Sequence, residues 1–199
     1  MENLIIRPIG IVKNKNKKEL LKYSREDIEL DHKLIREQGH DRKTSEIIIN
    51  EDYVDCLDGI KDFSHLVIIY WTHRTPEKAR KIRKVHPAGM EKMPIKGIFA
   101  TRSPVRPNPI ALISVKLIER IDNVLIVEGL DAINNTPIID IKPHLPSYDS
   151  PLNVKLADWM YSIMDEFKRL NKSGNDESPH SDHDMRAHPC ISPEQKQSK

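Results

Sequence analysis

Two arginines stand in a proline-rich stretch, Thr101–Pro109 (TRSPVRPNP). Arg102 and Arg106 each offer a permanent charge and a planar fork of N–H donors, which suits a carboxylate, a phosphate or the face of a base. Three prolines fix backbone angles in the stretch and lower the entropy cost of holding such a loop in place. From these residues alone, a ligand-binding loop and a proline-rich turn with a surface ion pair are equally good interpretations.

A second group of cations follows Thr75-Pro76-Glu77, a segment with the composition of a helix start. We therefore expect a helix with one basic face. Either solvation of that face or contact with RNA phosphates explains the run, and the salt sensitivity of RNA binding separates the two. The basic residues are Lys78, Arg80, Lys81, Arg83 and Lys84.

Several kinds of site have no support in the sequence. There is no glycine-rich phosphate loop and no G-x-G-x-x-G after a strand, so a Rossmann-type nucleotide site is disfavoured. Near the C-terminus His180, His183, His188 and Cys190 are spaced irregularly, and we predict no metal site there.

Composition sets broad limits. The chain has 199 residues, and 32 Lys and Arg against 30 Asp and Glu give a net charge of +2, which neither indicates nor excludes a nucleic-acid partner. Two cysteines, Cys56 and Cys190, are too few for a disulfide framework and predict a reducing, cytoplasmic location. No apolar stretch approaches the ~18 residues that span a bilayer, so we expect no membrane segment.

Short segments rich in Ile and Val predict a mainly β protein. Asp122-Asn123 separates two of them and predicts a tight hairpin turn. Because closure removes exposed edges, seven such strands with few helices favour a small antiparallel or mixed β-barrel. The predicted strands are Leu4–Val12, Glu46–Ile49, Leu66–Trp71, Gly97–Thr101, Ile113–Ile118, Val124–Val127 and Ile138–Ile141.

We expect the barrel domain to occupy residues 1–149, with three further features. Residues 14–43 form a highly charged excursion, predicted to be partly helical. Apolar residues that recur every three or four positions between Leu156 and Leu170 predict a C-terminal helix within 150–170. Residues 171–199 have few large aliphatics and no periodicity, so a disordered tail is expected.

Several motifs follow one another in a fixed order along the chain. The most distinctive is GIFATRSPVRPNPIAL, from Gly97 to Leu112. Upstream lie IGIV at Ile9–Val12 and LDGIKDFSHLVIIYWTHRT from Leu57 to Thr75, and downstream lies LDAINNTPIIDIKPHLP from Leu130 to Pro146. In this order they resemble the signature of the TsaA-like (TrmO) family of tRNA methyltransferases, and the resemblance covers about Ile5 to Asp149. One departure is the missing Pro-Arg-Gln element after the first strand, where this chain has the charged excursion.

The resemblance implies a β-barrel that binds S-adenosylmethionine without a Rossmann fold. It also implies a dimer that methylates the threonylcarbamoyl-modified adenosine beside the anticodon of certain tRNAs. The cofactor-binding residues that it suggests are His73, Arg74, Arg102, Leu112, Asp131, Ala132, Ile133 and Asn134. The RNA-binding residues that we predict are the basic run Lys78, Arg80, Lys81, Arg83 and Lys84, together with Arg106 of the proline-rich loop.

Each proposed cofactor role has an ordinary alternative. Arg102 suits the cofactor carboxylate or adenine face, or forms a structural ion pair. Asp131 accepts from the ribose diol or the amine, or caps a turn. Leu112 supplies apolar surface beneath the adenine, or simply packs in the core. No catalytic base is assigned.

Two other functions are compatible with the sequence. The altered region 14–43 could fit a different RNA or a small-molecule acceptor. A cofactor-binding module without catalysis is the third interpretation, favoured if the cofactor binds and no RNA acquires a methyl group.

Overall fold

The structure, a computed structural model, describes residues 4–16, 21–23, 27–30 and 44–172. By its internal contacts the chain divides into two compact units, Met1–His144 and Leu145–Lys199. The predicted disordered tail from residue 173 onward lies outside the described residues, with its three histidines and Cys190. Most of the excursion 14–43 also lies outside them.

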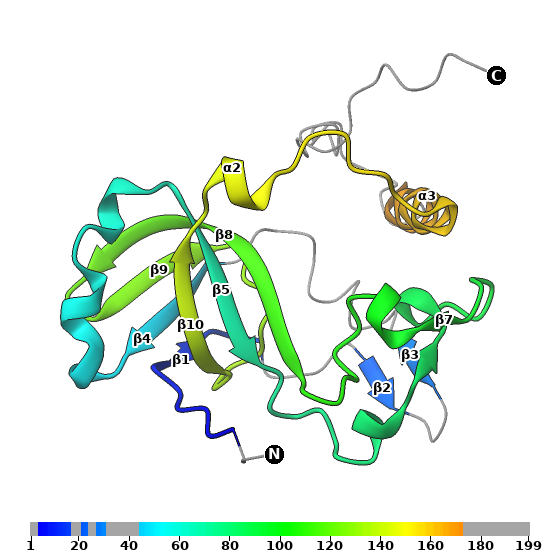
Figure 1. The fold of residues 1–199 in the computed structure, drawn as a ribbon, viewed down its shortest axis with the longest axis horizontal. Helices are drawn as coiled ribbons and strands as arrows, with labels where there is room; N and C mark the ends of the chain where they lie inside the picture. The colour runs from blue at the N-terminus through cyan, green and yellow to red at the C-terminus, as the bar shows by residue number, and fades with distance from the viewer. Residues whose placement is uncertain (1–3, 17–20, 24–26, 31–43, 173–199) are drawn as a thin grey trace. The chain divides into compact units, whose positions relative to one another are not determined.

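Six strands of the first unit close into a barrel in the order β1-β10-β5-β8-β9-β4 (Figure 1). Every neighbouring pair in it is antiparallel. Six of the seven predicted strands supply the barrel, so the prediction of a closed β-barrel is confirmed. Its strands are β1 (Gly10–Lys13), β4 (Thr44–Ile49), β5 (His65–Trp71), β8 (Ile110–Ile121), β9 (Val124–Glu128) and β10 (Pro137–Pro143).

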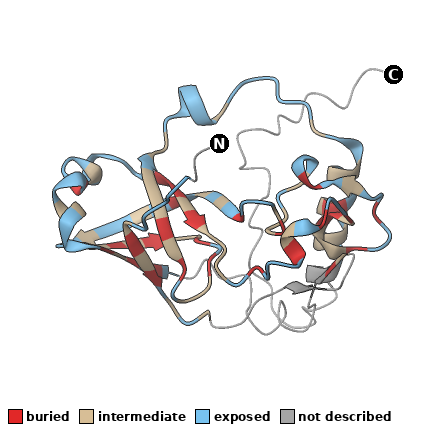
Figure 2. Ribbon diagram, turned by 60° about the horizontal axis from the view of Figure 1, so that its bottom comes forward, coloured by how far each residue is buried: buried red, intermediate tan, exposed pale blue. Residues whose placement is uncertain are grey.

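Alternating side chains fill the barrel. In β4 the buried positions are Ser45, Ile47 and Ile49, while Thr44 and Glu46 are exposed, which is the two-residue period of a strand with one buried face. Figure 2 shows such buried positions recurring along the barrel strands. Each fully buried aliphatic side chain among them contributes about 1.5–3 kcal/mol by leaving water. The core includes Val12, Ile47, Ile49, Leu66, Ile68, Val115, Leu125, Val127 and Ile138.

Two backbone features explain how the barrel closes. A Cβ atom at Gly10 would lie 2.5 Å from the Ile48 carbonyl oxygen, so only glycine lets β1 approach β4 this closely. The predicted hairpin is confirmed between β8 and β9, where Asp122 takes a positive φ of 51°. Asn123 Nδ2 then donates to the Ile49 carbonyl at 2.7 Å and ties the turn to β4.

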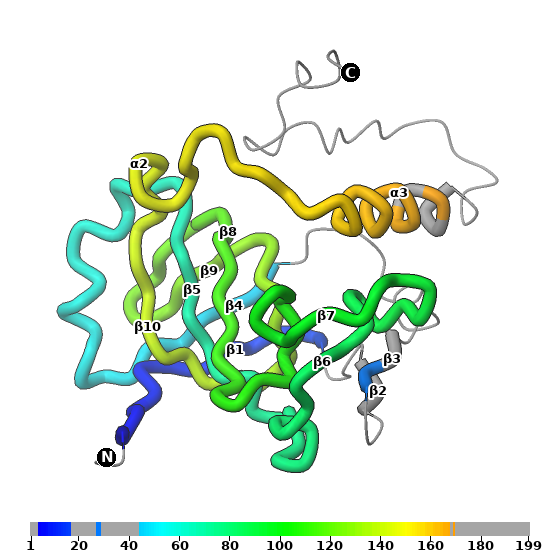
Figure 3. Tube along the Cα trace, turned by 45° about the vertical axis from the view of Figure 1, so that its right-hand side comes forward, coloured from blue at the N-terminus to red at the C-terminus, as the bar shows by residue number. Residues whose placement is uncertain are grey.

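A smaller apolar cluster lies apart from the barrel core. Two strand pairs accompany it: β2 (Leu21–Tyr23) with β3 (Ile28–Leu30), and β6 (Lys84–Val85) with β7 (Lys96–Gly97). Figure 3 shows β6 and β7 running side by side. The cluster consists of Ile28, Ala79, Ile82, Val85, Ile98 and Val105.

One prediction about this part of the chain is wrong and another is only partly covered by the described residues. Within the excursion, Leu21–Tyr23 and Ile28–Leu30 pair as strands, with Leu21 opposite Leu30, and Ile28 is buried in the small cluster. The rest of the predicted partly helical excursion lies mostly outside the described residues. The predicted strand Gly97–Thr101 contributes only Gly97 to β7 and continues as a 3₁₀ turn over Ile98–Ala100. The turn points Ile98 into the same cluster.

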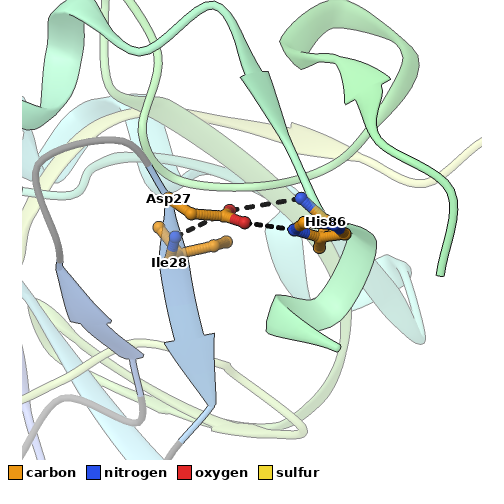
Figure 4. Close-up of polar contacts among 3 residues, drawn as sticks. All are labelled: Asp27, Ile28 and His86. Atoms are coloured by element: carbon orange, nitrogen blue, oxygen red, sulfur yellow. Dashed lines mark hydrogen bonds and ion pairs between the residues drawn. The ribbon is translucent and has the colours of Figure 1, made fainter. Parts of the chain in front are cut away.

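Asp27 joins the excursion to the chain after β6 (Figure 4). Its Oδ1 accepts from the backbone N–H of Ile28 at 2.8 Å and from that of His86 at 3.2 Å, and its Oδ2 contacts the Nδ1 of His86. Residues far apart in sequence are thereby fixed together by one carboxylate.

Short 3₁₀ helices complete the first unit, and two α-helices lie in the described part of the second unit. The predicted C-terminal helix begins later than residue 150, because Pro151 and the positive φ of Asn153, 58°, interrupt the chain before it. No helix among the described residues is long and apolar enough to cross a membrane. The helices are η1 (Glu51–Leu57), η2 (Ile60–Asp62), η3 (Ala79–Lys81), η4 (Pro87–Gly89), η5 (Ile98–Ala100), α2 (Pro146–Asp149) and α3 (Asp158–Lys172).

Candidate functional site

One end of the barrel gathers the segments that the sequence singled out. Tyr70, near the end of β5, pairs with Ala111 at the start of β8 and with Ile138 at the start of β10. The chain leaving β5, the proline-rich loop entering β8 and the segment entering β10 therefore meet around Tyr70. We call this end of the barrel the site end.

The turn after β5 carries His73 and Arg74. The backbone N–H and the hydroxyl of Thr72 both donate to the Pro109 carbonyl, at 2.8 and 2.9 Å, which fastens the turn to the proline-rich loop. Thr75 closes the turn through its N–H to the Thr72 carbonyl at 2.9 Å. Two loops distant in sequence thus share one rigid junction.

The electrostatics of this turn favour a neutral histidine. Partial burial lowers the pKa of His73, and the neighbouring Arg74 charge lowers it further. The Nδ1 atom of His73 lies 3.5 Å from the hydroxyl of Thr136, which is buried. An uncharged imidazole can stand near a cation without repelling it.

The proline-rich loop presents Arg102 outward. Its Nη2 donates to the Leu112 carbonyl at 3.0 Å, and the residue as a whole is exposed. Val105 is fully buried and anchors the loop from below. Leu112 is 52% exposed, so burial in the core does not account for it. The loop therefore offers a cation and an apolar side chain together.

Asp131 supplies an acidic group at the site end. Although the residue keeps an exposed surface, the surrounding protein limits the hydration of its carboxyl group and raises its pKa. Its backbone carbonyl accepts a 2.6 Å hydrogen bond from the Tyr70 hydroxyl. Burial raises the pKa of Tyr70, and the Asp131 charge raises it further, while the Arg102 charge lowers it. The charges of Asp131 and Arg102 therefore both act on the Tyr70 hydroxyl.

The segment after Asp131 is held by asparagines that follow β1. Asn14 Nδ2 donates to the Ala132 carbonyl at 2.9 Å and to the Ser45 hydroxyl at 3.1 Å. The Asn134 side-chain oxygen accepts from the Asn14 N–H at 3.1 Å, and the Asn134 N–H donates to the Asn16 carbonyl at 2.6 Å. Ala132 is buried, while Ile133 and Asn134 are partly exposed.

Sequence reasoning missed Tyr70 and Asn14. Tyr70 lies within an apolar strand, so the pattern predicts one more core residue. Its hydroxyl was the available signal, because a buried tyrosine hydroxyl usually has a hydrogen-bond partner. Asn14 is the first residue of the excursion, which stands where the family that this sequence resembles has a Pro-Arg-Gln element. A polar amide directly after a strand was the available signal, because such a side chain often holds a neighbouring loop.

The predicted basic helix is wrong. After Pro76 the chain forms only the short 3₁₀ helix η3 and then extends into β6. The backbone of Lys84 and Val85 pairs with β7, and Pro87 disfavours helix at the residue before it. Lys78, Lys81, Arg83 and Lys84 are nevertheless all exposed on this irregular segment.

Two of the predicted RNA contacts are engaged inside the protein. Arg80 lies over the Trp71 ring at 5.5 Å and donates through Nε to the Thr75 carbonyl at 3.3 Å. Arg106 directs Nη1 at three carbonyls, those of Ile98, Thr101 and Ser103, at 3.2, 2.9 and 3.5 Å. Arg106 therefore shapes the loop from within.

The part of the chain that the structure describes holds no group of three or more His, Cys, Asp or Glu residues placed for a metal ion. A hollow of about 320 Å³ is lined by Arg83, Gly97, Ile98, Phe99, Ala100 and Pro107, none of them a predicted cofactor residue. The cofactor hypothesis rests on the exposed groups around Tyr70.

Comparison with known proteins decides the family. The family model described as the tRNA-methyltransferase O N-terminal domain matches residues 32–150, more than half of the chain. This chain belongs to the tRNA-methyltransferase O family. The matched region includes β4 to β10 and so contains His73, Arg102 and Asp131.

Curated relatives match between half and three quarters of the chain. A Methanothermobacter thermautotrophicus protein named a probable S-adenosyl-L-methionine-binding protein is 38% identical over 145 residues, which are 73% of this chain and 93% of that protein. A Methanocaldococcus jannaschii protein with the same description is 44% identical over 104 residues, 52% of this chain and 82% of its own length. A human protein named tRNA (adenine(37)-N6)-methyltransferase is 40% identical over 105 residues, but these are only 23% of its length.

Solved TrmO structures share the fold. A crystal structure of TrmO from Pseudomonas aeruginosa aligns with a TM-score of 0.56 at 20% identity, covering 79% of this chain and 64% of that one. A second TrmO structure aligns with a TM-score of 0.57 at 18% identity, covering 85% and 77%. At these identities the likeness shows a common fold.

Proposed function

We propose that this protein binds S-adenosylmethionine at the site end of the barrel and methylates N6 of the adenine beside the anticodon of tRNA. The observation that carries the proposal is the convergence of Arg102, Asp131 and His73, from three separate segments, around Tyr70. Family membership and the names of the relatives support the same cofactor and reaction.

The side chains at the site end fit the parts of the cofactor. Arg102 would bind its carboxylate, Asp131 would accept from its ribose diol or amine, and Leu112 would pack under its adenine. The backbone of Ala132, Ile133 and Asn134 would contact the adenine edges. A neutral His73 can approach the sulfonium, whereas Arg102 and Arg74 must stay away, since like charges at ~4 Å repel by about 4 kcal/mol at an effective dielectric near 20.

When bound, S-adenosylmethionine supplies a methyl group that its sulfonium activates toward displacement. The protein then has to hold the donor and the acceptor nitrogen in line, and such positioning supplies about 7–11 kcal/mol of a barrier. We propose no catalytic base. The preferred acceptor is the threonylcarbamoyl-modified adenosine, whose nitrogen carries a more acidic proton than an ordinary amino group.

The RNA would lie against the exposed cations that follow the His73 turn. Lys78, Lys81, Arg83 and Lys84 would contact its phosphates, and each such contact would make binding weaker at higher salt. We further propose that the protein acts as a homodimer in the cytoplasm.

Nucleoside mass spectrometry of tRNA from cells with and without this protein tests the proposal. The methylated threonylcarbamoyl-adenosine should disappear when the protein is removed and return with the intact gene. An unchanged level of that nucleoside refutes this substrate. Cofactor binding by calorimetry, with no methyl transfer to modified or unmodified tRNA, would instead indicate a binding module without catalysis.

A further inference from the structure

Phe99 is the single aromatic residue of the signature stretch, and 78% of its surface is accessible. Single exposed apolar residues are common on protein surfaces and carry no meaning alone. Phe99 differs from these because its backbone and one neighbouring charge are fixed. The 3₁₀ turn η5 that carries it is anchored by Ile98, which is buried in the small apolar cluster.

Arg106 fixes the surroundings of the ring. Its guanidinium carbon lies 5.6 Å from the centroid of the Phe99 ring, a cation–π distance. The same guanidinium donates to three backbone carbonyls of the loop, so it cannot swing away without breaking them. The aromatic ring is therefore supported by an immobilised cation while most of its surface faces solvent.

The space beside the ring is mainly apolar and bordered by charge. The hollow of about 320 Å³ is lined by Phe99 together with Ile98, Pro107 and Arg83. Arg83 is exposed, so its guanidinium can meet an anion at the rim. An apolar floor with a cation at its edge suits a flat aromatic group that carries a phosphate.

The charge of this region points to the same ligand. Residues 78–106 contain nine Lys and Arg and one acidic residue, Glu91, a net charge of +8. Since the whole chain has a net charge of +2, the remainder carries −6. The positive charge is thus concentrated in the segments around Phe99, and a polyanion would be attracted there.

We propose that Phe99 stacks on an unpaired nucleobase of the RNA substrate, with Arg83 contacting the adjacent phosphate. The proposal rests on the RNA substrate of the proposed function and adds a subsite outside the cofactor residues. Every base has an aromatic face, so stacking on an exposed phenyl ring tolerates different sequences and requires an unpaired base.

Binding measurements test this subsite without depending on methyl transfer. The probes are a fluorescent anticodon stem-loop RNA and a fully paired RNA duplex of equal length, measured by anisotropy at one salt concentration. F99A and F99L should weaken binding of the stem-loop about 5- to 150-fold and leave the duplex and S-adenosylmethionine affinities unchanged. F99W should bind the stem-loop like the natural protein, with quenching of the new indole. F63L is the matched control, because Phe63 precedes β5 at the end of the strand away from the site end. It should leave the stem-loop affinity unchanged.

Several results would overturn the stacking role. Equal stem-loop affinity of F99L and the natural protein would exclude it, and so would equal losses for stem-loop and duplex. A change of oligomeric state in F99A would assign the ring to a contact between copies of the chain. If the natural protein methylates tRNA and F99A binds it equally well, only the subsite fails. If the stem-loop binds through Phe99 and no methyl group is transferred, only the proposed reaction fails.

Discussion

The hydroxyl of Tyr70 donates a 2.6 Å hydrogen bond to the backbone carbonyl of Asp131, across 61 residues of sequence. The tyrosine ring is buried in the barrel, while Asp131 has an exposed surface. This bond joins the core of the barrel to the acidic segment of the site. It makes the position of Asp131 depend on the packing of the barrel interior.

Tyr70→Phe should release that segment. Removal of the hydroxyl leaves the Asp131 carbonyl without this donor and should cost about 1 kcal/mol of unfolding free energy. The affinity for S-adenosylmethionine should fall several-fold because the segment loses its fixed position. Calorimetry and thermal unfolding measure the two effects. Tyr53→Phe, after the far end of β4, is the control and should keep the cofactor affinity; an unchanged affinity in Tyr70→Phe contradicts the anchoring role.

Arg102→Ala should weaken cofactor binding roughly 10- to 150-fold, as expected for the loss of a charge-assisted hydrogen bond. Arg102→Lys should recover only part of the affinity, because an ammonium cannot reproduce the planar fork. Isothermal titration gives the dissociation constants. Lys116→Ala removes an exposed cation from the middle of β8 and serves as the control. If Arg102→Ala binds the cofactor as tightly as the natural protein, our main site assignment is wrong.

Asn14→Ala should loosen the segment from Ala132 to Asn134. The change removes the donors to Ser45 and to the Ala132 carbonyl, and we expect a several-fold loss of cofactor affinity with about 1–2 kcal/mol of lost stability. Asn50→Ala is closely matched, because Asn50 Nδ2 also donates to a backbone carbonyl, that of Pro8 at 3.1 Å, but after the other end of β4. Equal cofactor affinities in the two variants would show that Asn14 has no special role at the site.

Arg74→Gln should raise the pKa of His73. Burial lowers that pKa first and the Arg74 charge lowers it further, so removal of the charge restores part of the shift. A histidine pKa below its ordinary value of 6.5 keeps the ring neutral at neutral pH. NMR titration of the ring protons reads the value directly. Arg102→Gln leaves Arg74 in place and provides the comparison; a shift of equal size there would argue against the neighbouring charge.

Cofactor affinity should fall at low pH through Asp131. Because its pKa is raised above the ordinary 3.8, the carboxyl group takes up a proton at a higher pH than an ordinary aspartate does. The proton blocks acceptance from the cofactor, so affinity decreases as the pH falls through the raised pKa. The effect of Asp131 on the free energy of unfolding has the opposite sign to that of an ion-paired aspartate. Because the surrounding protein disfavours the charged carboxylate, stability decreases as the pH rises and the carboxylate forms. Asp131→Asn should bind weakly and lose this pH dependence, which calorimetry at several pH values measures.

The sequence by itself determined the class of fold. Alternation of Ile and Val in short segments requires strands with one buried face, and Asp122-Asn123 permits a tight turn, so the barrel and its β8–β9 hairpin could be predicted. The ordered motifs also indicated the family that the comparison confirmed. The placement of His73, Arg102 and Asp131 at one end of the barrel followed only from the pairing of β5 with β8 and β10.

Tertiary structure decided which residues each polar group meets. A helix was expected over the basic run after Pro76, but pairing of β6 with β7 and burial of Ile82 and Val85 outweighed local propensity. Arg106 was expected to face RNA, whereas three loop carbonyls occupy its guanidinium. The type of a residue limits which hydrogen bonds its side chain can donate or accept. Only the folded chain decides which partner comes within hydrogen-bond distance, above all where the partner is distant in sequence, as Asp131 is from Tyr70.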